Sequence, residues 1–141
     1  MNVLRKFFSN FILLLSMTGG IVFIAQAASP SYETVSRCFF VYAGIIEAGR
    51  DSQHSEVYSF AQSRVGWVGG YVQANQENQE FKQVFEAGLR ANKQVGLQLK
   101  ATLISAISSR NVQSFSIAIQ EAAKCDRLIG IHTGSGPRLL Q

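Results

Sequence analysis

Apolar residues recur at intervals of three and four along most of the chain beyond residue 30, which is the pattern of amphipathic α-helices. In the clearest example, segment 34–46, one helical stripe holds Val35, Cys38, Phe39, Tyr42, Ile45 and Ile46. This pattern predicts a first helix that begins at Ser29-Pro30, because serine can cap free amide groups and proline suits the first helical position. We expect this helix to end near Ala48.

Three further helices follow from the same periodicity, and residues that favour caps or breaks separate them. We expect these helices to cover residues 52–74, 78–107 and 112–128. Gly49 is expected to end the first helix in a left-handed conformation, and Asp51 or Ser52 to cap the second. Gly130 should end the last helix. Because the sequence has no internal repeat and no convincing strand, it predicts an all-α domain.

The two cysteines constrain how these helices pack. Cys38 lies on the first predicted helix, and Cys125 lies on the apolar face of the last. In an exported chain, an even pair of cysteines favours a disulfide over a metal site or a nucleophile. The first and last helices of an up-and-down bundle are antiparallel, which brings both cysteines toward the same end. We therefore predict a small four-helix up-down bundle whose first and last helices are joined by a disulfide.

The N-terminal residues have the pattern of an export signal. Arg5 and Lys6 form a short positive region, residues 7–24 are mainly apolar, and a small-x-small sequence ends at Ala27. We predict a signal peptide that is cleaved between Ala27 and Ala28, which places the mature protein in the periplasm or outside the cell. The competing interpretation is an uncleaved membrane anchor, because the apolar run approaches the roughly 20 residues that span a bilayer.

The sequence therefore divides into a signal peptide (1–27), one helical domain (28–130) and a tail (131–141). The tail has turn residues and no periodicity, so we expect it to be flexible. A hydrophobic content of 47% and a charged content of 16% are ordinary for a globular domain. The net charge of +4 does not predict a nucleic-acid partner, because the basic residues are spread along the chain without a cluster.

A glycine-rich stretch is the least expected part of the second helix. Gly66, Gly69 and Gly70 stand close together, although each glycine costs about 1 kcal/mol relative to alanine in a helix interior. The favoured explanation is close helix packing, since Gly66 and Gly70 are four residues apart and would admit a neighbouring backbone. The alternative is a kink that exposes Trp67 and Tyr71 as a recognition patch.

Candidate catalytic residues are few. The chain has two histidines, His54 and His132, and we identify no catalytic set, no metal site and no cofactor motif. Asp51 and His54 are three residues apart near a predicted helix start and could place two ligands on one face, with Glu47 or Glu56 nearby. A cap and a solvated side chain are the more common explanation for such a pair.

These observations predict an exported helical interaction module that binds a protein, a peptide or an apolar ligand. Its candidate surface, which we call the glycine-aromatic patch, consists of Gly66, Trp67, Gly70 and Tyr71. A groove between helices is the other candidate surface. Two alternatives stay open: a metal-binding or small-ligand protein or enzyme that uses Asp51 and His54, and a membrane-anchored subunit with an uncleaved leader. The sequence does not specify the oligomeric state.

Overall fold

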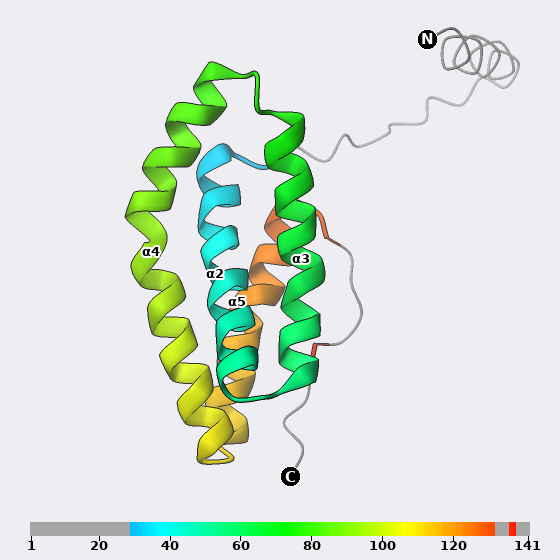
Figure 1. Ribbon diagram of the computed structural model, residues 1–141, viewed down its shortest axis with the longest axis vertical. Coiled ribbons are helices and arrows are strands. Elements are labelled where there is room, and N and C mark those ends of the chain that lie inside the picture. The colour runs from blue at the N-terminus through cyan, green and yellow to red at the C-terminus, as the bar shows by residue number, and fades with distance from the viewer. Residues whose placement is uncertain (1–28, 132–135, 138–141) are drawn as a thin grey trace, which may run out of the picture.

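The structure is a computed structural model that describes residues 29–131 and 136–137, and these residues form an all-α fold (Figure 1). Its helices are α2 (Tyr32–Asp51), α3 (Ser55–Ala74), α4 (Gln79–Ser108) and α5 (Val112–Ile129). The predicted all-α class and the four predicted helices are therefore confirmed for these residues. The predicted signal peptide lies outside the described residues, as does most of the predicted tail.

Helix α2 is the centre of the fold. It packs against α3, α4 and α5, whereas the backbone of α3 comes close to α2 alone among the described helices. Figure 1 shows α2 between α3 and α4, with α5 beside it. Nine of the 20 residues of α2 are buried, compared with four of the 20 residues of α3. Helix α3 is consequently an outer helix with a broad exposed surface.

The first helix begins slightly later than the sequence predicts. Ser31, rather than Ser29, is the N-cap of α2, and its Oγ accepts a hydrogen bond from the amide of Thr34 at 3.2 Å. Glu33 follows in the first turn, where a carboxylate complements the positive end of the helix dipole. The cap chemistry predicted for this helix is correct, but it is supplied by a serine two residues further along.

The prediction that Gly49 ends the first helix is wrong. Helix α2 continues through Gly49 to Asp51, and Gly49 is buried against α3. A Cβ atom at this position would lie 2.5 Å from the backbone nitrogen of Tyr58. Gly49 is therefore required for the close approach of two helices, and not for a left-handed turn.

The α2–α3 connection also corrects the predicted cap of the second helix. Gln53, with φ of 55°, supplies the left-handed residue of this turn. His54 is the N-cap of α3, since its Nδ1 accepts a hydrogen bond from the amide of Val57 at 3.5 Å. Asp51 and Ser52, the predicted caps, are the last residue of α2 and its C-cap.

The ends of the last two helices agree with the sequence pattern. Asn78 caps α4 by accepting a hydrogen bond from the amide of Phe81 at 3.0 Å, and Asn111 caps α5 in the same way. Gly130 ends α5 in the left-handed conformation, with φ of 78°. Here the residue types that favour helix ends act at the predicted positions.

Glycines allow α2 and α4 to pack closely. A Cβ atom on Gly44 would clash with the carbonyl oxygen of Gly96, and one on Gly96 would lie 2.8 Å from the carbonyl oxygen of Phe40. Nearer the start of α4, a Cβ atom on Gly88 would lie 2.7 Å from the Cβ of Ser36. The close helix contact that we expected at Gly66 and Gly70 therefore occurs at other glycines.

The predicted disulfide is present. Cys38 of α2 and Cys125 of α5 are bonded, their Cα atoms are 5.4 Å apart, and both residues are fully buried. The bond joins positions 87 residues apart and thus fixes the last helix of the fold to its central helix. The predicted link between the first and last helices is confirmed.

Candidate functional site

The outer face of α3 leaves its glycines open. A Cβ atom added at Gly66, Gly69 or Gly70 would meet no neighbouring atom of the described chain within 4 Å. The expectation that Gly66 and Gly70 form a packing seam within the domain is therefore wrong. The alternative was a break or kink at this stretch, and no break occurs, because α3 is one continuous helix from Ser55 to Ala74.

The same face of α3 carries no exposed charge beyond its first turn. Glu56 and Arg64 are the charged residues of this helix, and Arg64 is 4% exposed. The exposed positions after Glu56 are Ser59, Gln62, Ser63, Gly66, Gly69, Gly70, Gln73 and Ala74. By contrast, the exposed face of α4 includes Lys82, Glu86, Arg90 and Lys93, which is typical of a solvated helix. Helix α3 thus presents a flat, uncharged surface.

Two aromatic side chains border this surface. The rings of Trp67 and Tyr71 are stacked, with centroids 5.5 Å apart, and both residues are partly exposed. The Tyr71 hydroxyl donates a hydrogen bond to the carbonyl oxygen of Pro30 at 3.4 Å, and its ring contacts Phe81 edge-on. Burial, together with nearby Tyr32, raises the pKa of the Tyr71 phenol, so it stays a hydrogen-bond donor at neutral pH. The structure therefore brings together all members of the glycine-aromatic patch.

Tyr71 also lines an open groove of about 630 Å³ at the N-terminal end of α2. A second groove of about 630 Å³ continues between α2 and α4 and shares Glu33 and Val84 with the first. Small residues of α4 line this second groove, namely Ala87, Gly88 and Ala91. The two grooves adjoin at Glu33 and Val84, and the second lies between helices, which is the kind of surface that the sequence left as the other candidate.

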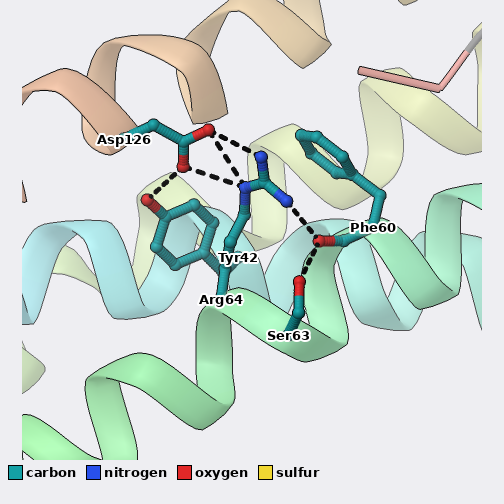
Figure 2. Close-up of polar contacts among 5 residues, drawn as sticks. All are labelled: Tyr42, Phe60, Ser63, Arg64 and Asp126. Carbon is teal, nitrogen blue, oxygen red and sulfur yellow. Dashed lines mark hydrogen bonds and ion pairs between the residues drawn. The ribbon is translucent and has the colours of Figure 1, made fainter. Parts of the chain in front are cut away.

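A buried polar cluster connects three helices, and Figure 2 shows its geometry. The Asp126 carboxylate of α5 accepts hydrogen bonds from Arg64 Nε at 2.9 and 3.1 Å and from Arg64 Nη2 at 2.7 Å. It also accepts one from the Tyr42 hydroxyl of α2 at 2.8 Å. Arg64 Nη1 donates to the carbonyl oxygen of Phe60 at 2.7 Å, and the guanidinium lies 3.6 Å above the Phe60 ring. The buried charges are thus paired and hydrogen-bonded.

The sequence interpretation missed this cluster, although a signal was available. Arg64 falls on the buried stripe of α3, between Ala61 and Val68, and Asp126 directly follows Cys125. A charged residue on an apolar stripe indicates a buried partner. Because Tyr42 is fully buried and the charged groups are nearly so, this cluster stabilises the fold and does not form an accessible site for a ligand.

The predicted pair of Asp51 and His54 is engaged in other contacts. Asp51 accepts a hydrogen bond from Lys100 at 2.7 Å and another from Arg50, and these two bonds hold the pKa of its carboxyl below the usual value. Lys100 also contacts Glu47 at 3.1 Å. His54 uses its Nδ1 atom to cap α3. Within residues 29–131 and 136–137, no three His, Cys, Asp or Glu side chains come together as metal ligands.

Comparison of the sequence with family models, with curated proteins and with solved structures gives no match. In the part of the chain that the structure describes, no helix combines the length and apolar character needed to cross a bilayer. The geometry of the helices and the residues they present are therefore the evidence from which function is inferred.

Proposed function

We propose that this protein is an exported, up-and-down helical bundle that binds a protein or peptide partner through the outer face of α3. The observation that carries the proposal is the open space around Gly66, Gly69 and Gly70. Each glycine costs about 1 kcal/mol relative to alanine in a helix interior, and no packing within the described domain offsets that cost. A partner that needs close access to the α3 backbone would offset it.

The chemistry of this face favours a helical partner segment. Glycines four residues apart let a second helix approach the backbone closely. Within the domain, Gly44 of α2 and Gly96 of α4 already allow two helices to approach each other closely. Because this face has no exposed charge, docking an apolar helix would require no desolvation of an ion. Trp67 and Tyr71 would supply the large aromatic contacts that commonly dominate binding energy. The expected partner is therefore a protein or peptide with an apolar, uncharged helical face.

Two features support export to the periplasm or the cell exterior. The leader has the charge, apolar run and cleavage sequence of a signal peptide. The buried Cys38–Cys125 bond is of a kind found mainly in oxidising compartments. If the leader stays attached instead, the same binding face would belong to a membrane-anchored subunit. Either way, the α3 face is the proposed contact surface.

The alternative function, a metal or small-ligand site at Asp51 and His54, has less support. The Asp51 carboxylate contacts Lys100 and Arg50, and His54 Nδ1 accepts the capping hydrogen bond from the amide of Val57. Metal binding would require both contacts to break. Metal titration by calorimetry, with His54→Ala as the comparison, tests this alternative directly, and saturable uptake that the variant loses would favour it over the α3 face.

Partner recovery from the native host tests the proposed function. Crosslinked complexes of the wild-type chain, Trp67→Ala and Tyr71→Ala are purified and their partners are quantified by mass spectrometry. Leu97→Ala is the matched control, because Leu97 is an apolar residue of α4 that is 45% exposed. The proposal predicts that both aromatic variants lose a partner that the control retains. Retention of every wild-type partner by both aromatic variants would count against the α3 face.

A further inference from the structure

The disulfide and the buried carboxylate join the same turns of two helices. Cys38 and Tyr42 are one turn apart on α2, and Cys125 and Asp126 are consecutive on α5. The disulfide links Cys38 to Cys125. The Tyr42 hydroxyl donates a 2.8 Å hydrogen bond to Asp126. The position of the Asp126 carboxylate is therefore fixed next to a covalent link to the central helix.

Arg64 extends this connection to α3, which carries no cysteine. Its guanidinium binds both oxygens of Asp126, and Figure 2 shows it reaching from α3 to α5. The backbone of α3 approaches α2, but it has no close backbone contact with α4 or α5 among the described elements. Its buried side chains are Val57, Ala61, Arg64 and Val68. The Arg64–Asp126 pair thus ties α3 to α5, and the ring of Tyr71 separately contacts Phe81 of α4.

We propose that closure of the Cys38–Cys125 bond is the oxidative step that docks α3 onto the rest of the fold. In the oxidised chain, the bond holds Asp126 where Arg64 can reach it. In the reduced chain, the last turns of α5 separate from α2 and the carboxylate becomes hydrated. Arg64 then loses its hydrogen bonds to Asp126, and α3 loses one of the contacts that order it. The redox state of Cys38 and Cys125 thereby controls how well α3 is ordered, although α3 contains neither cysteine.

The chemistry of the step is a thiol–disulfide exchange with a disulfide oxidant, either a protein or a small molecule. The thiolate of one cysteine attacks the oxidant and forms a mixed disulfide, which releases one thiol of the oxidant. The thiolate of the second cysteine then displaces the other thiol, so two electrons and two protons pass from the protein to the oxidant. Since both cysteines are fully buried in the folded chain, exchange requires the end of α5 to be open. The bond therefore forms during folding.

Helix α4 provides an internal reference for this inference. It packs on α2 through Gly44 and Gly96, whose backbones approach each other closely, and this contact involves neither the disulfide nor Asp126. The loss of the disulfide should consequently leave the α2–α4 contact in place. Helix α3 also carries the glycine-aromatic patch, so partner binding would depend on oxidation. That last consequence rests on the proposed function, whereas the ordering of α3 does not.

Hydrogen exchange measured by mass spectrometry tests the inference on the full exported chain. The oxidised wild type is compared with Cys38→Ala/Cys125→Ala and with Asp126→Asn, in which the disulfide is intact. We expect amides in the middle of α3 to exchange about tenfold faster or more in both variants, while amides of α4 near Gly96 keep their protection. Lys100→Met, which breaks a partly buried ion pair between α4 and α2, is the control and should leave α3 unchanged.

Several outcomes would overturn this inference. Unchanged protection of α3 in the cysteine variant would do so, and so would an equal loss in α3 and α4, which includes complete unfolding. Unchanged protection in Asp126→Asn would remove the role of the carboxylate. A combined variant that lacks both cysteines and Asp126 should exchange no faster in α3 than the cysteine variant, because both changes break the same connection. Partner recovery is not a readout here, so a failure of the proposed function is distinguishable from a failure of this inference.

Discussion

The guanidinium of Arg64 and the carboxylate of Asp126 form a bidentate ion pair between α3 and α5, with a shortest N–O distance of 2.7 Å. Their side chains are 5% and 10% exposed. The Tyr42 hydroxyl also donates a hydrogen bond to Asp126, and the carbonyl oxygen of Phe60 accepts one from Arg64. Because burying a charge is unfavourable unless it is paired, this ion pair specifies one position of α3 relative to α5. The exposed face of α3 then points away from the domain.

Removal of one partner of this ion pair should destabilise the fold strongly. We expect Asp126→Ala to lower the free energy of unfolding by about 3–5 kcal/mol, because it removes the carboxylate that pairs with the buried Arg64 guanidinium. Urea denaturation checks this value. The double variant Arg64→Met/Asp126→Ala should lose much less than the sum of the single losses. Additive losses would indicate that the two side chains do not act as a pair.

Stability should fall in alkaline solution, partly because of Tyr42. Burial, reinforced by the Asp126 carboxylate, raises the pKa of its phenol above the usual 10.0. The unfolded chain then releases this proton at lower pH than the folded chain, so the stabilising contribution is complete below pH 10 and declines as the pH rises further. The expected slope is up to about 1.4 kcal/mol per pH unit for this one proton.

Tyr42→Phe checks this assignment. In urea denaturation at several pH values, the variant should lose about 1 kcal/mol near neutral pH through the missing hydrogen bond. Above pH 10, its stability should decline less steeply than that of the wild type. Tyr58→Phe, on the partly exposed side of α3, is the control. An alkaline slope that is identical in Tyr42→Phe and the wild type would contradict the account.

Alanine substitution should change the free energy of unfolding in opposite directions at an open glycine and at a closely packed one. Gly69→Ala adds a methyl group in open space and should raise the free energy of unfolding by up to about 1 kcal/mol. Gly44→Ala would push a methyl group into the backbone of Gly96 and should lower it by about 1–3 kcal/mol. Chemical denaturation of both variants provides the comparison. Destabilisation by Gly69→Ala would show that this glycine has a role within the domain.

The leader and the disulfide can be tested together by mass spectrometry of the exported protein. We expect a chain that starts at Ala28 and that gains the mass of two hydrogens when it is reduced. The second result follows because Cys38 and Cys125 form the disulfide. An intact leader would instead support the membrane-anchored subunit.

Much of the fold follows from local sequence patterns. The helix periodicity, the Asn78 cap and the Gly130 end were all predictable, because each depends on residues within one or two turns. The pairing of Cys38 with Cys125 was predictable because no other pair exists. The end of α2 was not predictable in this way, since Gly49 packs directly against Tyr58 of the next helix and local sequence does not reveal that contact.

The candidate site could be predicted in part. The sequence identified Gly66, Trp67, Gly70 and Tyr71 as a potential surface, although it favoured internal packing as the explanation for the two glycines. Local spacing shows that glycines could let a second helix approach closely. Which glycines pack against another helix depends on where the neighbouring helices lie. The role of Arg64 depends in the same way on a partner 62 residues away, Asp126.

Site-specific photo-crosslinking tests the central claim, that α3 is the contact surface, most directly. A photoreactive amino acid replaces Gln62 or Gln73 on the exposed face of α3, or Gln94 on the exposed face of α4 as the control. After irradiation in the native host, the account predicts that the same partner crosslinks from both α3 positions and not from Gln94. The absence of a crosslink from α3, or equal crosslinking from all three positions, would contradict it.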